Sequence, residues 1–340
     1  MTSAGVVLRW RTEQVRRPAI VWSGLAMVIL STALAIGICA GPTLHSPATA
    51  LRALLDDAHP LHGVLGGIRL PRVLAGLAVG AALATAGALL QAVVRNPLAD
   101  PGILGVTAGA GFAALATIVL WPQATLWLPF FAFCGGLIEV VFVLLLAWRR
   151  GAGSSALRIV LTGVALQALC LAGASILTFL FADRAPAFSA FLVGSLNGTG
   201  WTDVAMVALP TLIGLIAALA SIGALDLLQL DEATAEGRGL DIRRTRIWLA
   251  GVAALLAAAA VSVAGLVGFV GLVVPNALRL VTGPSHRLLI PIGAIGGGAL
   301  VVLADAAARS SVAPLELPVG ALLALVGGPY FLWLLWSRIP

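Results

Sequence analysis

The chain has 340 residues, of which 60% are hydrophobic and only 10% are charged, and its mean hydropathy is +1.07. This composition excludes a soluble globular domain and is typical of an integral membrane protein. All 20 basic residues are Arg, so the chain lacks the Lys of a phosphate-binding P-loop, and any ATP that drives it must be bound by another polypeptide.

Hydropathy predicts an all-α integral membrane fold with about ten spans, each near the roughly 20 residues that cross a bilayer. We treat residues 1–340 as a single transmembrane domain. The first apolar run is longer than the core of a signal peptide and lacks a clear cleavage site, so we expect it to be retained. The spans lie near residues 19–41, 71–94, 103–121, 125–148, 157–182, 203–225, 247–267, 270–283, 288–308 and 318–337.

An N-terminus on the cytosolic side gives these spans a consistent orientation, with the C-terminus cytoplasmic as well. Counted on that topology, 15 Arg lie inside and five outside, which agrees with the excess of basic residues in cytoplasmic loops. The net charge of +6 is therefore better explained by topology than by nucleic-acid binding. The five outside residues are Arg52, Arg69, Arg72, Arg184 and Arg309.

The segment between the first two spans carries Asp56, Asp57, His59 and His62, which could be drawn as a metal site. Nothing in the sequence orders these side chains, so we expect a solvated loop beside a short amphipathic helix and no metal site. The His residues combine with no Ser or Cys at a hydrolase spacing, and we predict no catalytic residues and no enzyme. The three Cys fall in apolar spans, where we expect buried thiols and no disulfide.

Small residues recur four positions apart in the second and third spans, at Gly76 and Gly80 and again at Gly105 and Gly109. This spacing lets helix backbones approach closely in a membrane. We therefore expect both spans to pack tightly against neighbouring helices.

A turn with the sequence NPLADPG joins those two spans. Asp100 suits an N-cap, with Pro101 at the first helical position. The pattern predicts a tight corner on the cytosolic side. We take Asn96, Pro97, Asp100 and Pro101 as a candidate gate.

Residues 226–246, DLLQLDEATAEGRGLDIRRTR, carry nine charged side chains between two apolar spans. Such a segment cannot sit in hydrocarbon, where each charge costs several kcal/mol. We expect a polar cytoplasmic platform made of two short helices and a turn at Gly237 and Gly239. A rigid platform of this kind suits a cytosolic partner that pushes on it, and a plain solvated loop is the alternative.

A short internal repeat pairs RVLAG at 72–76 with RIWLAG at 246–251. On the predicted topology the first copy enters the membrane from outside and the second from inside. Inverted repeats of this kind are typical of transporters.

Two carboxylates, Glu139 and Asp305, fall inside predicted spans. A proton or cation relay is the functional interpretation. Asp305 lies four residues before Arg309, the spacing of a same-face helical pair, so we favour an ion pair there. Glu139 has no such partner and keeps a proton-coupled secondary carrier open as an alternative.

Five motifs are specific when they occur together: RLPR at 69–72, NPLADPG at 96–102, GLDIRRTR at 239–246, GLVGFVGLVVP at 265–275 and ELPVG at 316–320. Together they resemble the FecCD family, the membrane permeases of type II ABC importers for ferric siderophores, haem and vitamin B12. The resemblance runs from about residue 65 to the C-terminus.

The resemblance implies a type II ABC importer permease fold in a bacterial inner (cytoplasmic) membrane. Two such subunits, identical or paralogous, would surround a central pathway. Two copies of a cytosolic ABC ATPase would bind ATP and Mg, and an external substrate-binding protein would deliver the cargo. No cofactor is expected on this chain itself.

Residue by residue, the resemblance implies three roles. The fifth span, around Leu161 to Phe181, is similar to the helix that lines the pathway. Arg69, Arg72 and Arg309 resemble residues that pair with acidic groups on the binding protein, with snorkelling at the membrane interface as the alternative. The ATPase-coupling positions are Asp231, Glu232, Ala233, Glu236, Gly237, Arg238, Gly239, Leu240 and Asp241.

One departure from the family pattern is Asn276, which stands where the family usually has His after GLVVP. Any role of that His in subunit contact or gating is in doubt here, although Asn keeps a hydrogen-bonding side chain. The sequence FLVGSLNG at 191–198, followed by Trp201, looks more like siderophore permeases. Ferric siderophore is therefore the expected cargo, with haem second and cobalamin third. A purely structural membrane subunit is a further alternative.

Overall fold

The computed structural model describes residues 3–41, 43–147, 156–184, 191–312 and 315–338. Within these residues the regular secondary structure is helical, and turns, loops and one isolated bridge between Val312 and Leu315 connect the helices. Seven helices are long and apolar enough to cross a membrane, and three further apolar helices are shorter. The prediction of an all-α membrane protein with about ten spans is thus confirmed. Residue 148, the predicted end of the fourth span, lies outside the described residues.

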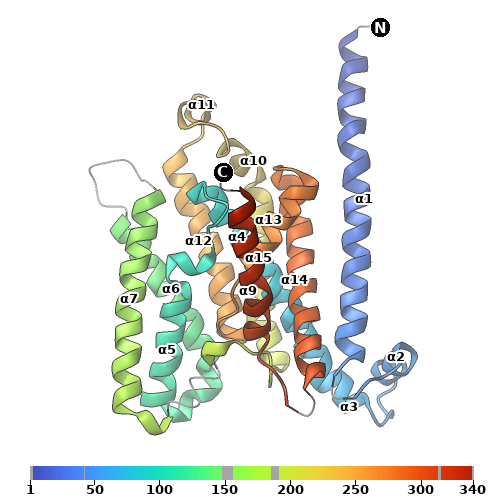
Figure 1. Ribbon diagram of the computed structural model, residues 1–340, viewed down its shortest axis with the longest axis vertical. Helices are drawn as coiled ribbons and strands as arrows, with labels where there is room; N and C mark the ends of the chain where they lie inside the picture. Colours follow the sequence, from blue (N-terminus) through green and yellow to red (C-terminus); the bar gives the residue numbers. More distant parts are fainter. Residues whose placement is uncertain (1–2, 42, 148–155, 185–190, 313–314, 339–340) are drawn as a thin grey trace.

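The helices lie side by side in a single bundle (Figure 1). Both termini and α11 lie at one end of the bundle, and α2 and α3 lie at the other. In order, the elements are α1 (Ser3–Cys39), α2 (Pro47–Leu55), α3 (His62–Val64), η1 (Leu65–Arg69), α4 (Leu70–Val94), η2 (Pro101–Leu104), α5 (Val106–Leu120), η3 (Pro122–Trp127), α6 (Leu128–Ala147), α7 (Ala156–Leu180), η4 (Ala182–Arg184), α9 (Trp201–Ala220), α10 (Ile222–Leu227), α11 (Glu232–Gly237), α12 (Ile242–Ala264), α13 (Val270–Thr282), α14 (His286–Ser311) and α15 (Val319–Arg338).

The core of the bundle is built on α4 and α12, the two helices that carry the internal repeat. In the spans that contain them, 78% and 72% of the residues in the apolar segment are buried, against 17% in the span of α7. They contact each other and both contact α9, while α4 also packs on α13 and α14. In Figure 1, α4 runs towards the α11 end and α12 runs back from it. The two copies of the repeat therefore lie antiparallel at the centre of the fold, as an inverted repeat requires.

Glycines on α4 let its neighbours come into backbone contact. A methyl group added at Gly80 would lie 2.1 Å from the carbonyl oxygen of Gly297 on α14. One added at Gly87 would lie 1.9 Å from the carbonyl oxygen of Gly271 on α13. Both contacts are closer than any side chain allows, so these helix crossings require glycine on α4. The predicted close packing at Gly80 is confirmed.

The segment between α1 and α4 contains α2 and short turns, close to the predicted short helix with loops. Asp57 and His62 approach to 3.5 Å. Among the described residues, no three His, Cys, Asp or Glu side chains are grouped to hold a metal ion. The three Cys are free, as predicted, but they are only partly buried, because Cys39, Cys134 and Cys170 lie on helices α1, α6 and α7 at the margin of the bundle.

Candidate functional site: the polar platform and its anchor

The segment from Asp226 to Arg246, here called the platform, projects from the end of the bundle that holds both termini (Figure 1). One short helix, α11, lies wholly within these described residues, while α10 (Ile222–Leu227) reaches only the first two of them. The expectation of two short helices broken at the glycines is therefore wrong, because the chain between residues 228 and 231 is already non-helical and the glycines come at the end of α11. The glycine turn follows α11, and the membrane helix α12 begins at Ile242, five residues earlier than the predicted span. The reason is local capping, since the side chain of Asp241 accepts a hydrogen bond from the Arg244 amide (3.0 Å) and starts α12 there.

Capping groups define α11 at both ends. The Asp231 carboxylate bonds with the Thr234 side chain and also accepts a hydrogen bond from the Thr234 amide (2.9 Å). These bonds hold the pKa of Asp231 below its ordinary value. At the other end, the Leu240 amide donates to the Ala235 carbonyl (3.1 Å) while Gly239 adopts a φ of +83°. This is a Schellman-type end, which favours glycine at the left-handed position. The short helix is therefore rigid although it is only six residues long.

The predicted coupling positions form the exposed surface of the platform. All are exposed except Leu240, which is partly buried, and Ala235 between them is fully buried. Glu232 also reaches back to the membrane helix, because its Oε1 accepts a hydrogen bond from Arg246 (2.8 Å). A charged, capped surface with one buried anchor is a suitable docking face for another protein. The exposed positions are Asp231, Glu232, Ala233, Glu236, Gly237, Arg238, Gly239 and Asp241.

The base of the platform is tied to two core helices. Arg95, in the turn after α4, donates to the carbonyl oxygens of Leu228 (3.2 Å) and Leu230 (2.9 Å). The Oδ1 of Asp226 lies 2.9 Å from Nδ1 of His286, the first residue of α14. A displacement of the platform therefore pulls directly on the ends of α4 and α14.

The predicted corner sits next to this base. The Asp100 side chain accepts a hydrogen bond from the Gly102 amide (2.9 Å), so Asp100 is an N-cap as predicted, and burial raises the pKa of its carboxyl. It caps the short η2, and not a membrane helix, because Gly105 at φ +80° separates η2 from α5. Asn96 caps its own turn through the Leu98 amide (2.9 Å). Pro101 is the first residue of η2, as expected.

Asn276, the residue that departs from the family pattern, links the corner to α13. Its amide nitrogen donates to the carbonyl oxygens of Pro97 (2.8 Å) and Leu272 (2.8 Å). The side chain is 7% exposed. The hydrogen-bonding capacity that Asn retains is therefore used in this chain to hold the corner.

The three arginines assigned to binding-protein docking lie at the opposite end of the bundle, and all are buried, at 6%, 6% and 3% exposure for Arg69, Arg72 and Arg309. Arg72 donates to both oxygens of Asp305 (2.9–3.1 Å) and to Glu316 (2.8 Å). Arg309 pairs with Asp305 at 2.9 Å. The ion pair predicted from the spacing of Asp305 and Arg309 is confirmed.

Two of these arginines also cap the last turn of α1. Arg69 donates to the carbonyl oxygens of Ile38 (3.0 Å) and Cys39 (3.3 Å), and Arg309 donates to those of Gly37 (2.9 Å) and Ala40 (3.2 Å). The last carbonyls of a helix have no intrahelical partner, and cations there are favourable. The arginines thus fasten the first span to the bundle. Their contact with a binding protein stays a prediction.

Glu139 on α6 is 4% exposed and faces α5 at Gly105 and Gly109. Its carboxylate lies against the backbone of Gly109 and the thiol of Cys170. With Cys170 of α7, it lines an apolar cavity of about 420 Å³ between α5, α6 and α7. No basic residue in the described part of the chain forms an ion pair with Glu139, which leaves the sequence interpretation unchanged.

The helix expected to line the pathway, α7, lies at the edge of the bundle (Figure 1) and is among the least buried of the candidate spans. It exposes Leu161, Leu169 and Phe179. An apolar face of this size requires lipid or a second subunit against it. Sequence reasoning missed the polar contacts beneath the platform, at Gln91, Gln229, Arg279 and His286, because no motif links these distant positions.

Comparison with known proteins places the chain in one family. The family model described as the FecCD transport family matches residues 28–337. The chain is 37% identical to the Fe(3+)-citrate import system permease protein YfmE of Bacillus subtilis, covering 95% of this chain and 97% of that one. It is 42% identical to the cobalamin import system permease protein BtuC of Halobacterium salinarum, covering 81% and 74%, and 41% identical to the hemin transport system permease protein HmuU of Yersinia pestis, covering 79% and 81%.

A solved structure agrees with these relatives. It is described as an inward-facing conformation of a metal-chelate type ABC transporter, and it covers 93% of this chain and 99% of its own with a TM-score of 0.83 and 29% identity. The relatives also include two permeases of one Bacillus subtilis system, YfmE and YfmD, so permeases of this kind occur in pairs. The chain belongs to the FecCD transport family and is the membrane permease subunit of an ABC importer, a transport component and not an enzyme.

Proposed function

We propose that this chain moves a ferric siderophore across the bacterial inner membrane, with the platform receiving the motion of a cytosolic ABC ATPase. The observation that carries the mechanism is the platform itself: an exposed charged face fixed through Arg95 and Asp226 to the ends of α4 and α14. Closure of the two ATPase subunits on ATP and Mg would displace this face. The displacement would then switch the access of the pathway between the two sides of the membrane.

The cargo is proposed from the relatives. The relative named for Fe(3+)-citrate matches nearly the full length of both chains, at 95% and 97%, whereas the cobalamin relative is covered over 74% of its length. An iron chelate is therefore favoured over cobalamin, with haem as the second candidate because of the hemin permease. The termini and the platform share one end of the bundle, which supports the proposal that both termini are cytoplasmic.

The external binding protein would dock at the end that holds α2 and the three arginines. Because Arg69, Arg72 and Arg309 are buried, they would act by holding that surface in place, while exposed Arg52 on α2 is free to contact a partner's carboxylates. Arg52→Glu is expected to weaken docking and its salt dependence. Pull-down assays with the binding protein measure docking. If Arg52→Glu leaves docking unchanged, and docking is lost only in variants that unfold, the proposal of electrostatic docking at this end is wrong.

Uptake of radiolabelled ferric siderophore, haem and cobalamin by cells lacking and regaining this chain tests the cargo. Restored, ATP-dependent uptake of ferric siderophore is the expected result. Restored uptake of haem or cobalamin alone would change the cargo and keep the mechanism. Uptake that survives ATP depletion and collapses with the proton gradient would contradict the ATP-driven mechanism and favour a proton-coupled carrier that uses Glu139.

The coupling role has its own test in Ala233→Arg. Ala233 is exposed on α11, so the added side chain blocks the docking face with little effect on folding. We expect loss of uptake and of ATPase stimulation by cargo. Gln123→Arg, exposed on η3, adds the same group outside the platform and should leave both unchanged; equal activity of the two variants would contradict the coupling assignment.

A further inference from the structure

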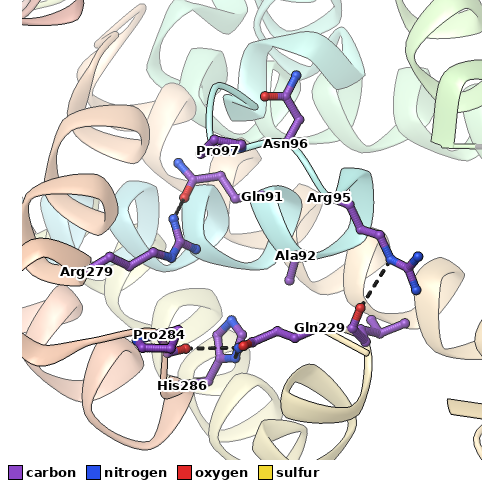
Figure 2. A pocket seen from close by; sticks show the side chains of 10 residues that line it. Gln91, Ala92, Arg95, Asn96, Pro97, Gln229, Arg279, Pro284 and His286 are labelled. Atoms are coloured by element: carbon purple, nitrogen blue, oxygen red, sulfur yellow. Dashed lines mark hydrogen bonds between the residues drawn. The ribbon is translucent and has the colours of Figure 1, made fainter. Parts of the chain in front are cut away.

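A cavity of about 290 Å³ lies at the base of the platform, between the end of α4, the last turn of α13 and the start of α14 (Figure 2). It is distinct from the exposed docking face of α11. Because a water molecule occupies roughly 30 Å³, the space holds a small polyatomic ligand together with several waters. Its polar lining is made by Gln91, Arg95, Asn96, Gln229, Arg279 and His286.

Arg279 is the dominant charge in this cavity. Its guanidinium donates to the side-chain oxygens of Gln91 and Asn276, both of which are neutral. No carboxylate in the described part of the chain pairs with it. A partly buried guanidinium with only neutral partners keeps an unbalanced positive charge, which is costly unless an anion approaches it.

His286 presents a second unsatisfied group. The side chain is 2% exposed, and its Nε2 has no hydrogen-bond partner among the described residues. Nδ1 lies 2.9 Å from Oδ1 of Asp226, which only accepts, and 2.9 Å from the side-chain nitrogen of Gln229, which only donates. Figure 2 shows the His286 ring between Pro284 and Ala92. The ring thus helps to fix the wall of the cavity opposite Arg279.

The carboxylates of Glu232 and Asp226 contact other groups, since Arg95 lies 3.9 Å from Glu232 and the His286 ring lies 2.9 Å from Asp226. Arg279 differs, because no carboxylate among the described residues pairs with its guanidinium. The cavity therefore offers an anion a guanidinium that no carboxylate in the described part of the chain already binds.

We propose that this cavity binds a small oxyanion of the phosphate or carboxylate class. The planar guanidinium of Arg279 contacts two oxygens of the anion. Arg95, which also lines the cavity, adds positive potential. Binding joins the base of the platform to α4, α13 and α14 at the point where the platform is anchored.

Calorimetric titration of the full-length protein in lipid nanodiscs tests the site, with sodium phosphate, citrate and chloride as separate titrants at constant ionic strength and neutral pH. We expect saturable binding of phosphate or citrate and none of chloride. Tighter binding of phosphate would identify an anion released by ATP hydrolysis, and tighter binding of citrate would identify the carboxylate of a chelator. This test does not depend on the cargo proposed above, because it measures binding and not transport.

Matched variants separate the cavity from general surface charge. Arg279→Gln removes the unbalanced cation and should weaken binding about tenfold or more, whereas Arg279→Lys keeps the charge and should weaken it less. Arg287→Gln removes an exposed charge one residue from His286 and should change the affinity by less than about twofold, the range expected for a screened surface charge. Thermal unfolding without ligand confirms that each variant is folded. Absence of saturable binding, or equal loss in the Arg279→Gln and Arg287→Gln variants, would overturn the proposal and leave Arg279 for a carboxylate of a partner chain.

Discussion

At one end of the bundle, Arg72 and Arg309 are buried around Asp305, and Arg309 also caps the first membrane helix. At the other end, the charged residues of the platform stay exposed on a capped helix. Both regions are marked in the sequence by Arg and Asp near the ends of apolar spans. Burial decides what those charges do. Where they are desolvated they must satisfy one another and hold helices together, and where they are solvated they remain available to a partner.

The largest expected effect tests the buried end. Asp305→Asn keeps the shape of the side chain but removes the charge that pairs with Arg72 and Arg309, so we expect a loss of about 3–5 kcal/mol in the free energy of unfolding. Asp241→Asn on the platform is the matched variant, because Asn also caps helices well, and it should change stability by well under about 1 kcal/mol. Denaturant unfolding in detergent measures the free energy of unfolding of both variants. Similar losses of stability in the two variants would contradict the proposed difference between the two ends.

The next effect concerns the rigidity of the platform. Gly239→Ala forces a side chain into the left-handed region at φ +83°, which costs about 1–2 kcal/mol, and it weakens the end of α11. We expect reduced uptake with near-normal membrane insertion. The control is Gly237→Ala, where a methyl group meets nothing within 4 Å and φ is not positive. If Gly237→Ala impairs uptake as strongly as Gly239→Ala, the Schellman-type end is not what holds the platform.

The smallest effect is a pH dependence at the start of α11. The pKa of Asp231 is held below its ordinary value by its hydrogen bonds to Thr234, so the folded carboxyl loses its proton more readily than the unfolded one. The stabilisation is therefore fully present above the ordinary Asp pKa of about 3.9 and is lost as the pH falls through the lower folded pKa. Hydrogen exchange at the Thr234 amide should accelerate across that acid window, relative to an intrinsic-rate control, and Asp231→Asn should abolish the change. An unchanged profile in Asp231→Asn would assign the acceleration to other groups.

Much of the local structure was readable in the sequence because it depends on neighbours in the chain. Apolar runs of membrane length placed the spans, the NPLADPG pattern placed the cap at Asp100, and the charge density of residues 226–246 placed the platform. The start of α12 was misplaced because the hydropathy pattern follows the bilayer, whereas the helix begins at the Asp241 cap outside the apolar run. The spacing of Asp305 and Arg309 predicted their ion pair for the same local reason, since residues four apart share a helix face.

The sequence by itself determined that this chain is a helical membrane protein, which family it resembles and where its polar segments lie, because hydropathy, capping and motif spacing are local properties. Only the tertiary structure decided which distant groups meet. It buried Arg69, Arg72 and Arg309 against α1 and Asp305, and it joined Asp226 to His286 across 60 positions. It also placed Arg279 in a cavity where no carboxylate among the described residues pairs with it. Those outcomes depend on how α4, α13 and α14 pack, and helix packing brings together side chains that no sequence pattern pairs.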